Sequence, residues 1–67
     1  MKQRKERDFV KRICEELQFE VIVSRIEILE THIKDNELIG VTFKDRFGTK
    51  YLVYYNKYNE PQFRKIL

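Results

Sequence analysis

The sequence has no tryptophan, no alanine, one cysteine, one proline and only two glycines. One cysteine cannot form an intramolecular disulfide or a multi-cysteine zinc site, and a lone thiol is typical of the reducing cytoplasm, where we expect the protein to reside. Two isolated glycines exclude a glycine-rich phosphate loop. No run of about 18 apolar residues is present, so no membrane span is expected. No apolar stretch follows the basic N-terminus, so we expect no secretory signal.

What the chain does contain is typical of a small globular protein. Its 67 residues are 42% apolar and 13% aromatic, which is too rich for intrinsic disorder. We predict one domain spanning residues 1–67. A core of this size supplies only about 3–5 kcal/mol of stability. Homodimerisation is one way to bury surplus apolar surface, and a molecular mass that is independent of concentration would exclude it.

The net charge of +3 conceals a basic, acidic, basic order along the chain. Residues 1–12 carry six basic and two acidic side chains, residues 13–37 carry two and seven, and residues 38–67 carry six and two. A chain that only coats phosphate has no need of an acidic middle. Either the basic ends converge on one face, or the acidic stretch meets a basic partner.

Apolar spacing predicts a helix over residues 2–18. Phe9, Val10, Ile13, Cys14 and Leu17 recur at intervals of three and four, which forms one apolar stripe. Charged residues occupy the opposite face, so the helix should pack on one side only.

The next fifteen residues predict extended structure. Residues 19–23 alternate and are β-branched, which indicates a strand. Residues 24–33 allow two interpretations. Period-two spacing and three isoleucines favour a long, bulged strand, whereas Ser24 and Glu27 form a capping-box pattern typical of a helix start.

The second half of the chain predicts hairpins. Residues 34–37 form a turn, and 38–44 form a strand with Ile39, Val41 and Phe43 on one face. Gly40 inside that strand indicates a bulge or a close backbone approach. Gly48 supplies the positive φ of a hairpin turn over 45–48.

The strand predicted over 49–56 is apolar on both faces, with Tyr51, Val53 and Tyr55 on one and Leu52 and Tyr54 on the other, which is typical of a central strand.

The last residues predict a short helix capped by Asn59, with a short edge strand as the alternative. The fold class is therefore α+β: an N-terminal amphipathic helix on a small three-stranded antiparallel sheet, α-β-β-β, with or without a short C-terminal helix.

The sequence does not contain the side chains that enzymes require. Cys14 lies on the apolar stripe, which predicts a buried and inert thiol. His32 is the sole histidine and lacks a recognisable nucleophile beside it. Asp35, Asn36 and Glu37 resemble a fragment of a cation loop without its remaining ligands. We predict no catalytic residues, no metal and no cofactor.

Two stretches resemble restriction-endonuclease-like nucleases. Residues 7–21 look like the opening helix and strand of that family, and residues 51–57 look like its metal-binding strand. That strand carries an acidic residue two positions before its lysine, and Tyr55 stands there in this chain. Tyrosine is a poor Mg²⁺ ligand, so the resemblance implies no nuclease catalysis.

The predicted order of elements is similar to the double-stranded-RNA-binding fold, which small RNA-cleaving toxins also use. That family carries a basic cluster that opens its last helix and a Gly-Pro-x-His-type loop. Here Arg64 and Lys65 come late, and His32 has neither glycine nor proline beside it. The likeness implies RNA binding by fold analogy alone.

Two functional hypotheses remain open, and both describe a small non-enzymatic binding module of bacterial or phage type. The first is nucleic-acid binding, because basic side chains neutralise phosphate and aromatic rings stack on bases. Its candidate residues are Lys2, Arg4, Lys5, Arg7, Lys44, Arg46, Lys50 and Lys57.

The second hypothesis is a protein-binding inhibitor or regulator, which would present its acidic middle segment and tyrosines to a basic protein surface such as that of a nucleic-acid-processing protein. Its candidate residues are Glu16, Glu20, Glu27, Glu30, Tyr54 and Tyr58.

Overall fold

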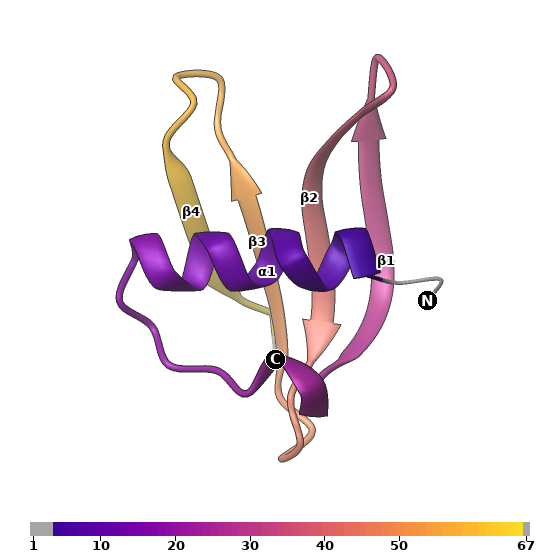
Figure 1. Ribbon diagram of the computed structural model, residues 1–67, viewed down its shortest axis with the longest axis vertical. Coiled ribbons are helices and arrows are strands. Elements are labelled where there is room, and N and C mark those ends of the chain that lie inside the picture. Colours follow the sequence, from indigo (N-terminus) through magenta and orange to yellow (C-terminus); the bar gives the residue numbers. More distant parts are fainter. Residues whose placement is uncertain (1–3, 67) are drawn as a thin grey trace.

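One helix lies across a four-stranded antiparallel sheet (Figure 1). The computed structural model describes residues 4–66. Its elements are the helix α1 (Arg4–Glu16), the 3-10 turn η1 (Val23–Arg25) and the strands β1 (Glu27–Lys34), β2 (Glu37–Lys44), β3 (Lys50–Tyr55) and β4 (Pro61–Lys65). The strand order is β1-β2-β3-β4, so each strand pairs with its neighbours in sequence. The α+β class is confirmed, and the prediction of three strands is wrong by one.

The helix begins and ends close to where the apolar spacing predicted. Its termination is a Schellman-type motif, in which the Phe19 amide donates to the Cys14 carbonyl at 2.8 Å. Gln18 adopts a left-handed conformation with φ of 57°. This geometry turns the chain sharply off the helix at residue 18.

The strand predicted over 19–23 is wrong. This segment runs without sheet pairing from α1 into η1. Phe19, Val21 and Val23 nevertheless pack against the core. Their alternation therefore reflects side chains that pack against the core, and not a hydrogen-bonded strand.

The strand interpretation of residues 24–33 is confirmed from Glu27 onward, and two irregularities interrupt the pairing of β1 with β2. Leu29 is an extra residue on β1, and Ile39 is an extra residue on β2. The second bulge places Leu38 against the core. Ile39 lies beside His32 on the other face, so the prediction that it shares a face with Val41 and Phe43 is wrong.

The turns follow the local chemistry of their residues. Asp35 and Asn36 both have positive φ, as a two-residue hairpin turn requires, and Gly48 has φ of 87° as predicted. The C-terminal helix is wrong and the edge-strand alternative is confirmed as β4. Pro61 starts this strand, where its missing N–H does no harm. The ending therefore departs from that of the double-stranded-RNA-binding fold.

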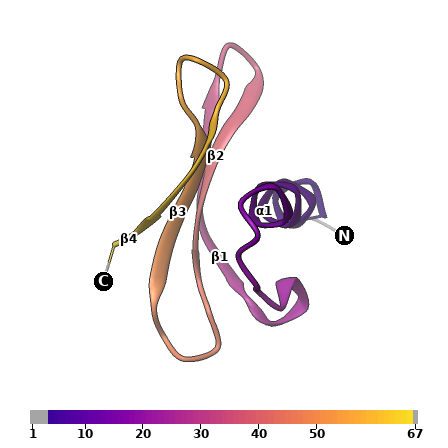
Figure 2. The ribbon, with the colours of Figure 1, turned by 90° about the vertical axis from the view of Figure 1, so that its left-hand side faces the viewer.

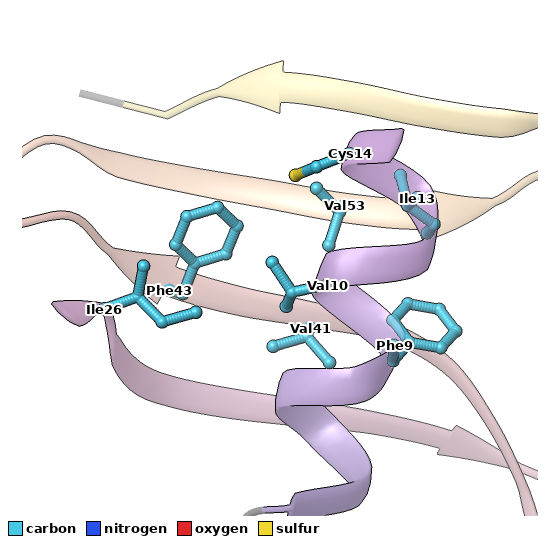
Figure 3. Packing of buried hydrophobic residues seen from close by; sticks show 8 residues of the cluster. All are labelled: Phe9, Val10, Ile13, Cys14, Ile26, Val41, Phe43 and Val53. Carbon is cyan, nitrogen blue, oxygen red and sulfur yellow. The ribbon is translucent and has the colours of Figure 1, made fainter. Parts of the chain in front are cut away.

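The core forms between α1 and one face of the sheet (Figure 3). Its buried members are Phe9, Val10, Ile13, Cys14, Ile26, Val41, Phe43 and Val53. Aromatic rings of Phe19, Tyr51 and Phe63 extend it toward the end of α1, with Phe19 and Phe63 centroids 4.1 Å apart. Burial raises the pKa of the Cys14 thiol to about 11, so it is the unreactive thiol that the stripe predicted.

No helix within residues 4–66 is long and apolar enough to cross a membrane.

Candidate functional site

The sheet face opposite α1 is open. Figure 2 shows the helix on one side of the sheet and no element of residues 4–66 on the other. Two cross-strand rows lie on this open face: Glu30, Thr42, Leu52 and Arg64 in one, and His32, Gly40, Tyr54 and Gln62 in the next. Each row crosses all four strands, so the open face is a continuous surface.

A shallow apolar hollow of about 220 Å³ lies at the centre of the open face. Ile39, Leu52 and Tyr54 provide its apolar lining beside His32. Gly40 forms part of it, and a Cβ added there would lie 3.1 Å from the Tyr54 Cβ and 3.2 Å from the Val53 carbonyl oxygen. The close approach predicted at this glycine is therefore confirmed.

His32 is held in place on this face. Its Nε2 lies 3.0 Å from Oγ1 of Thr42, whose side chain is buried at 6% exposure. This hydrogen bond satisfies a buried hydroxyl and fixes the imidazole ring beside the hollow.

Basic side chains gather at one end of the sheet, around the β2–β3 hairpin. We call this cluster the basic end and define it as Arg25, Lys44, Arg46, Lys50 and Lys65. Lys44 and Lys50 are directly opposite each other on the open side, whereas Lys65 pairs with Tyr51 and lies on the α1 side of the sheet. Like charges at directly opposed positions destabilise a sheet. The Lys44–Glu27 ion pair, at 3.6 Å and largely solvated, offsets less than about 1 kcal/mol of that repulsion.

The loop at this end has a hydrogen-bonded backbone and an exposed aromatic ring. The Asp45 Oδ1 accepts hydrogen bonds from the amides of Phe47 and Thr49, both at 2.9 Å. Phe47 is 78% exposed, and the Arg46 guanidinium lies 4.9 Å from its ring centroid. Arg25, Asp45 and Phe47 share a hollow of about 420 Å³ beside η1.

The β3–β4 loop repeats this design at the opposite end of β3 (Figure 1). The Asn56 Oδ1 accepts the amides of Tyr58 and Glu60 at 2.9 Å, and Lys57 lies 5.2 Å from the Tyr58 ring centroid. Asn59, with φ of 63°, takes the place of the glycine. This repeat was not predicted, although its Asx–basic–aromatic–Gly/Asn pattern is visible in the sequence.

The eight residues predicted to bind nucleic acid do not form one surface. Lys44, Arg46 and Lys50 come together at the basic end, whereas Lys57 lies in the loop at the other end. Arg4 and Lys5 are exposed on the first turn of α1, and Lys2 lies outside the described residues.

Arg7 has a structural role. Its guanidinium donates to the carbonyl oxygens of Val23 at 2.7 Å and Ile26 at 3.1 Å, which ties η1 to the helix.

The residues predicted to bind a protein are also divided. Glu16 lies at the end of α1, where it accepts a hydrogen bond from the Tyr55 hydroxyl at 2.8 Å, and Glu20 follows in the loop. Burial raises the pKa of Tyr55, the bond to Glu16 and its negative charge raise it further, and Arg12 opposes them. The others lie elsewhere: Glu27 and Glu30 on β1, Tyr54 on the open face and Tyr58 in the β3–β4 loop.

Within residues 4–66, no three His, Cys, Asp or Glu side chains come close enough together to hold a metal ion. Comparisons with protein-family models, curated proteins and solved structures find no match to this chain. The basic end and the open face are therefore the two candidate functional surfaces.

Proposed function

We propose that this protein is a non-enzymatic nucleic-acid-binding module that contacts the phosphate backbone through its basic end. The observation that supports the proposal is that basic residues of η1, β2, β3, β4 and the β2–β3 loop lie at the same end of the sheet as the exposed Phe47 ring. Repulsion between Lys44 and Lys50 lowers the stability of the unbound protein, and a phosphate that lies between the two side chains relieves it.

The arrangement favours single-stranded nucleic acid. A base that stacks on an exposed aromatic ring contributes about 1–3 kcal/mol, and duplex bases are not available for such stacking. The Asx turn orders the backbone at Phe47, so little backbone freedom of the loop is lost on binding. With about four phosphates neutralised, log K should fall with log salt with a slope of roughly −3 for a single strand.

The test is fluorescence anisotropy with labelled single- and double-stranded DNA and RNA over a range of salt concentrations. The doubly substituted Lys44→Glu, Lys50→Glu protein should lose at least about tenfold in affinity and show a shallower salt slope. The matched control is Lys11→Glu with Lys34→Glu, which makes the same change in net charge away from the basic end. Absence of binding at low salt, or an equal loss in the control, would overturn the proposal.

The open face favours the second candidate function, a protein-binding regulator, because an apolar centre with a charged rim is typical of interfaces. Charge reversal separates the two functions. Glu30→Lys, at the acidic edge of the open face, should weaken capture of a basic protein surface without lowering nucleic-acid affinity. The Lys44 and Lys50 reversals should have the opposite effect.

A further inference from the structure

The open face has opposite charges at its two edges. Glu30 on β1 and Arg64 on β4 stand at the two ends of one cross-strand row, with Thr42 and Leu52 between them. Strands lie about 4.8 Å apart, so these two charges are about 14 Å apart within one chain. They are too distant to pair with each other, and within residues 4–66 neither takes part in an ion pair, so each can pair across an interface.

We infer that the open face is a homodimer interface in which a second copy packs face to face, with the two-fold axis parallel to the strands. This rotation keeps each cross-strand row at the same position along the strands and reverses the order of its residues, so that β1 of one copy faces β4 of the other. Glu30 then faces Arg64 of the second copy, and the reciprocal pair forms at the other edge. A two-fold axis perpendicular to the strands would instead stack β1 on β1 and bring acidic edges together.

Side-chain sizes are complementary under the same operation. Reversal of the second row places Tyr54 over Gly40 of the second copy, and Gly40 is where the hollow of about 220 Å³ lies. A large ring thus meets the smallest residue of the row, twice. Facing sheets pack about 10 Å apart, a distance that Glu and Arg side chains together can bridge.

The size of the face sets the expected strength. Four strands of about six residues give a footprint of roughly 20 Å by 20 Å, which falls in the small-interface class below about 1,200 Å² in total. We therefore expect a reversible dimer that dissociates in the micromolar range.

The dimer also has a consequence for the proposed nucleic-acid binding. Of the points in this inference, this one alone rests on the proposed function. An axis parallel to the strands leaves both β2–β3 hairpins at the same end of the dimer, so the two basic ends lie side by side. Lys44 then faces Lys50 of the second copy, with Glu27 beside it as a partial offset. A bound polyanion should relieve this repulsion and tighten the dimer.

The decisive experiment is sedimentation equilibrium of the full chain without nucleic acid, from roughly 1 µM to 1 mM protein, with Glu30→Arg and Arg64→Glu as separate variants. The wild-type mass should rise with concentration to that of a dimer. Each single variant should weaken dimerisation at least about tenfold, because like charges then meet twice.

Mixing the two single variants in equal amounts should restore dimerisation, because both interfacial pairs are then of opposite charge. The doubly substituted protein should also dimerise, which a general loss of fold could not produce. Glu15→Arg on the exposed side of α1 is the matched control and should leave the dimer unchanged. A monomer at every concentration, or a mixture that does not recover, would overturn the inference. Neither result bears on nucleic-acid binding by the monomer, which the anisotropy measurement tests separately.

Discussion

The two faces of the sheet come from the same strands and have opposite characters. Toward α1, Val41, Phe43 and Val53 are wholly buried. Their sequence neighbours Leu52 and Tyr54 point the other way and stay partly exposed around a hollow. Both faces are apolar at their centre, and only one has a partner within the described chain. The difference indicates that the covered face provides stability, whereas the open face is available for association.

Truncation of one side chain on each face should show the largest contrast. Phe43→Ala leaves a cavity under the helix and should cost about 3–5 kcal/mol, which is the whole stability expected of a domain this size. Leu52→Ala on the open face should cost less, about 1–2 kcal/mol, because that side chain is only partly buried. Urea denaturation followed by circular dichroism gives both values. Equal losses would mean that the open face is part of the monomer's core.

Alkaline pH should lower the stability of the folded protein through a group on the covered face, the Cys14 thiol. The pKa of Cys14 is raised from 9.0 to about 11 by burial, so the folded state holds its proton more tightly than the unfolded state. The stabilisation is fully present below pH 9 and is lost as pH rises toward 11, by about 2–3 kcal/mol. Tyr55, whose pKa is also raised, acts in the same direction. Cys14→Ala should reduce the pH dependence of the urea denaturation midpoint between pH 9 and 11. An unchanged pH dependence would show that the thiol does not cause the loss of stability.

Gly40→Ala tests how closely the neighbouring atoms pack against residue 40 on the open face. The new methyl group would meet Tyr54 and the Val53 carbonyl at little more than 3 Å, so one of them must shift. We expect a loss of about 1–3 kcal/mol in thermal or urea unfolding. A stabilised variant would instead mean that β2 tolerates the Cβ and gains from its strand propensity.

Thr42→Val should have the smallest effect, about 0.5–1.5 kcal/mol, because it removes one hydrogen bond at nearly constant volume. The same substitution made in a His32→Phe background should cost less, since the bond is already absent there. Additive losses in this double-mutant cycle would show that the two side chains do not interact.

How well the sequence predicted these features depended on how local their causes are. The helix, the strand through Val53 and the turn at Gly48 follow from spacing or backbone preference within a few residues. The strand predicted over 19–23 failed because alternation marks burial and does not show which backbone it pairs with. The prediction of the face on which Ile39 lies failed for a related reason, because a bulge depends on the pairing with the partner strand.

The candidate site shows the same dependence. Lys44, Arg46 and Lys50 flank one hairpin turn, so the prediction of that turn already placed them together. Arg7 could not be interpreted in this way, because its two carbonyl partners lie 16 and 19 residues further along the chain. The two matching loops were within reach of the sequence, since their pattern is entirely local.

The meander order of the sheet also determines how the chain can fold. Every strand pairs only with its neighbours in sequence, and each of the last two hairpin loops is closed by the side chain of its own first residue. Such hairpins form in microseconds, and a chain dominated by short-range contacts folds quickly overall. Docking of α1 closes a longer loop than the hairpins do, so we expect it to be the slowest step. Until it occurs, both sides of the meander are equally open, so the docking rate determines how long Phe43 is exposed to other chains.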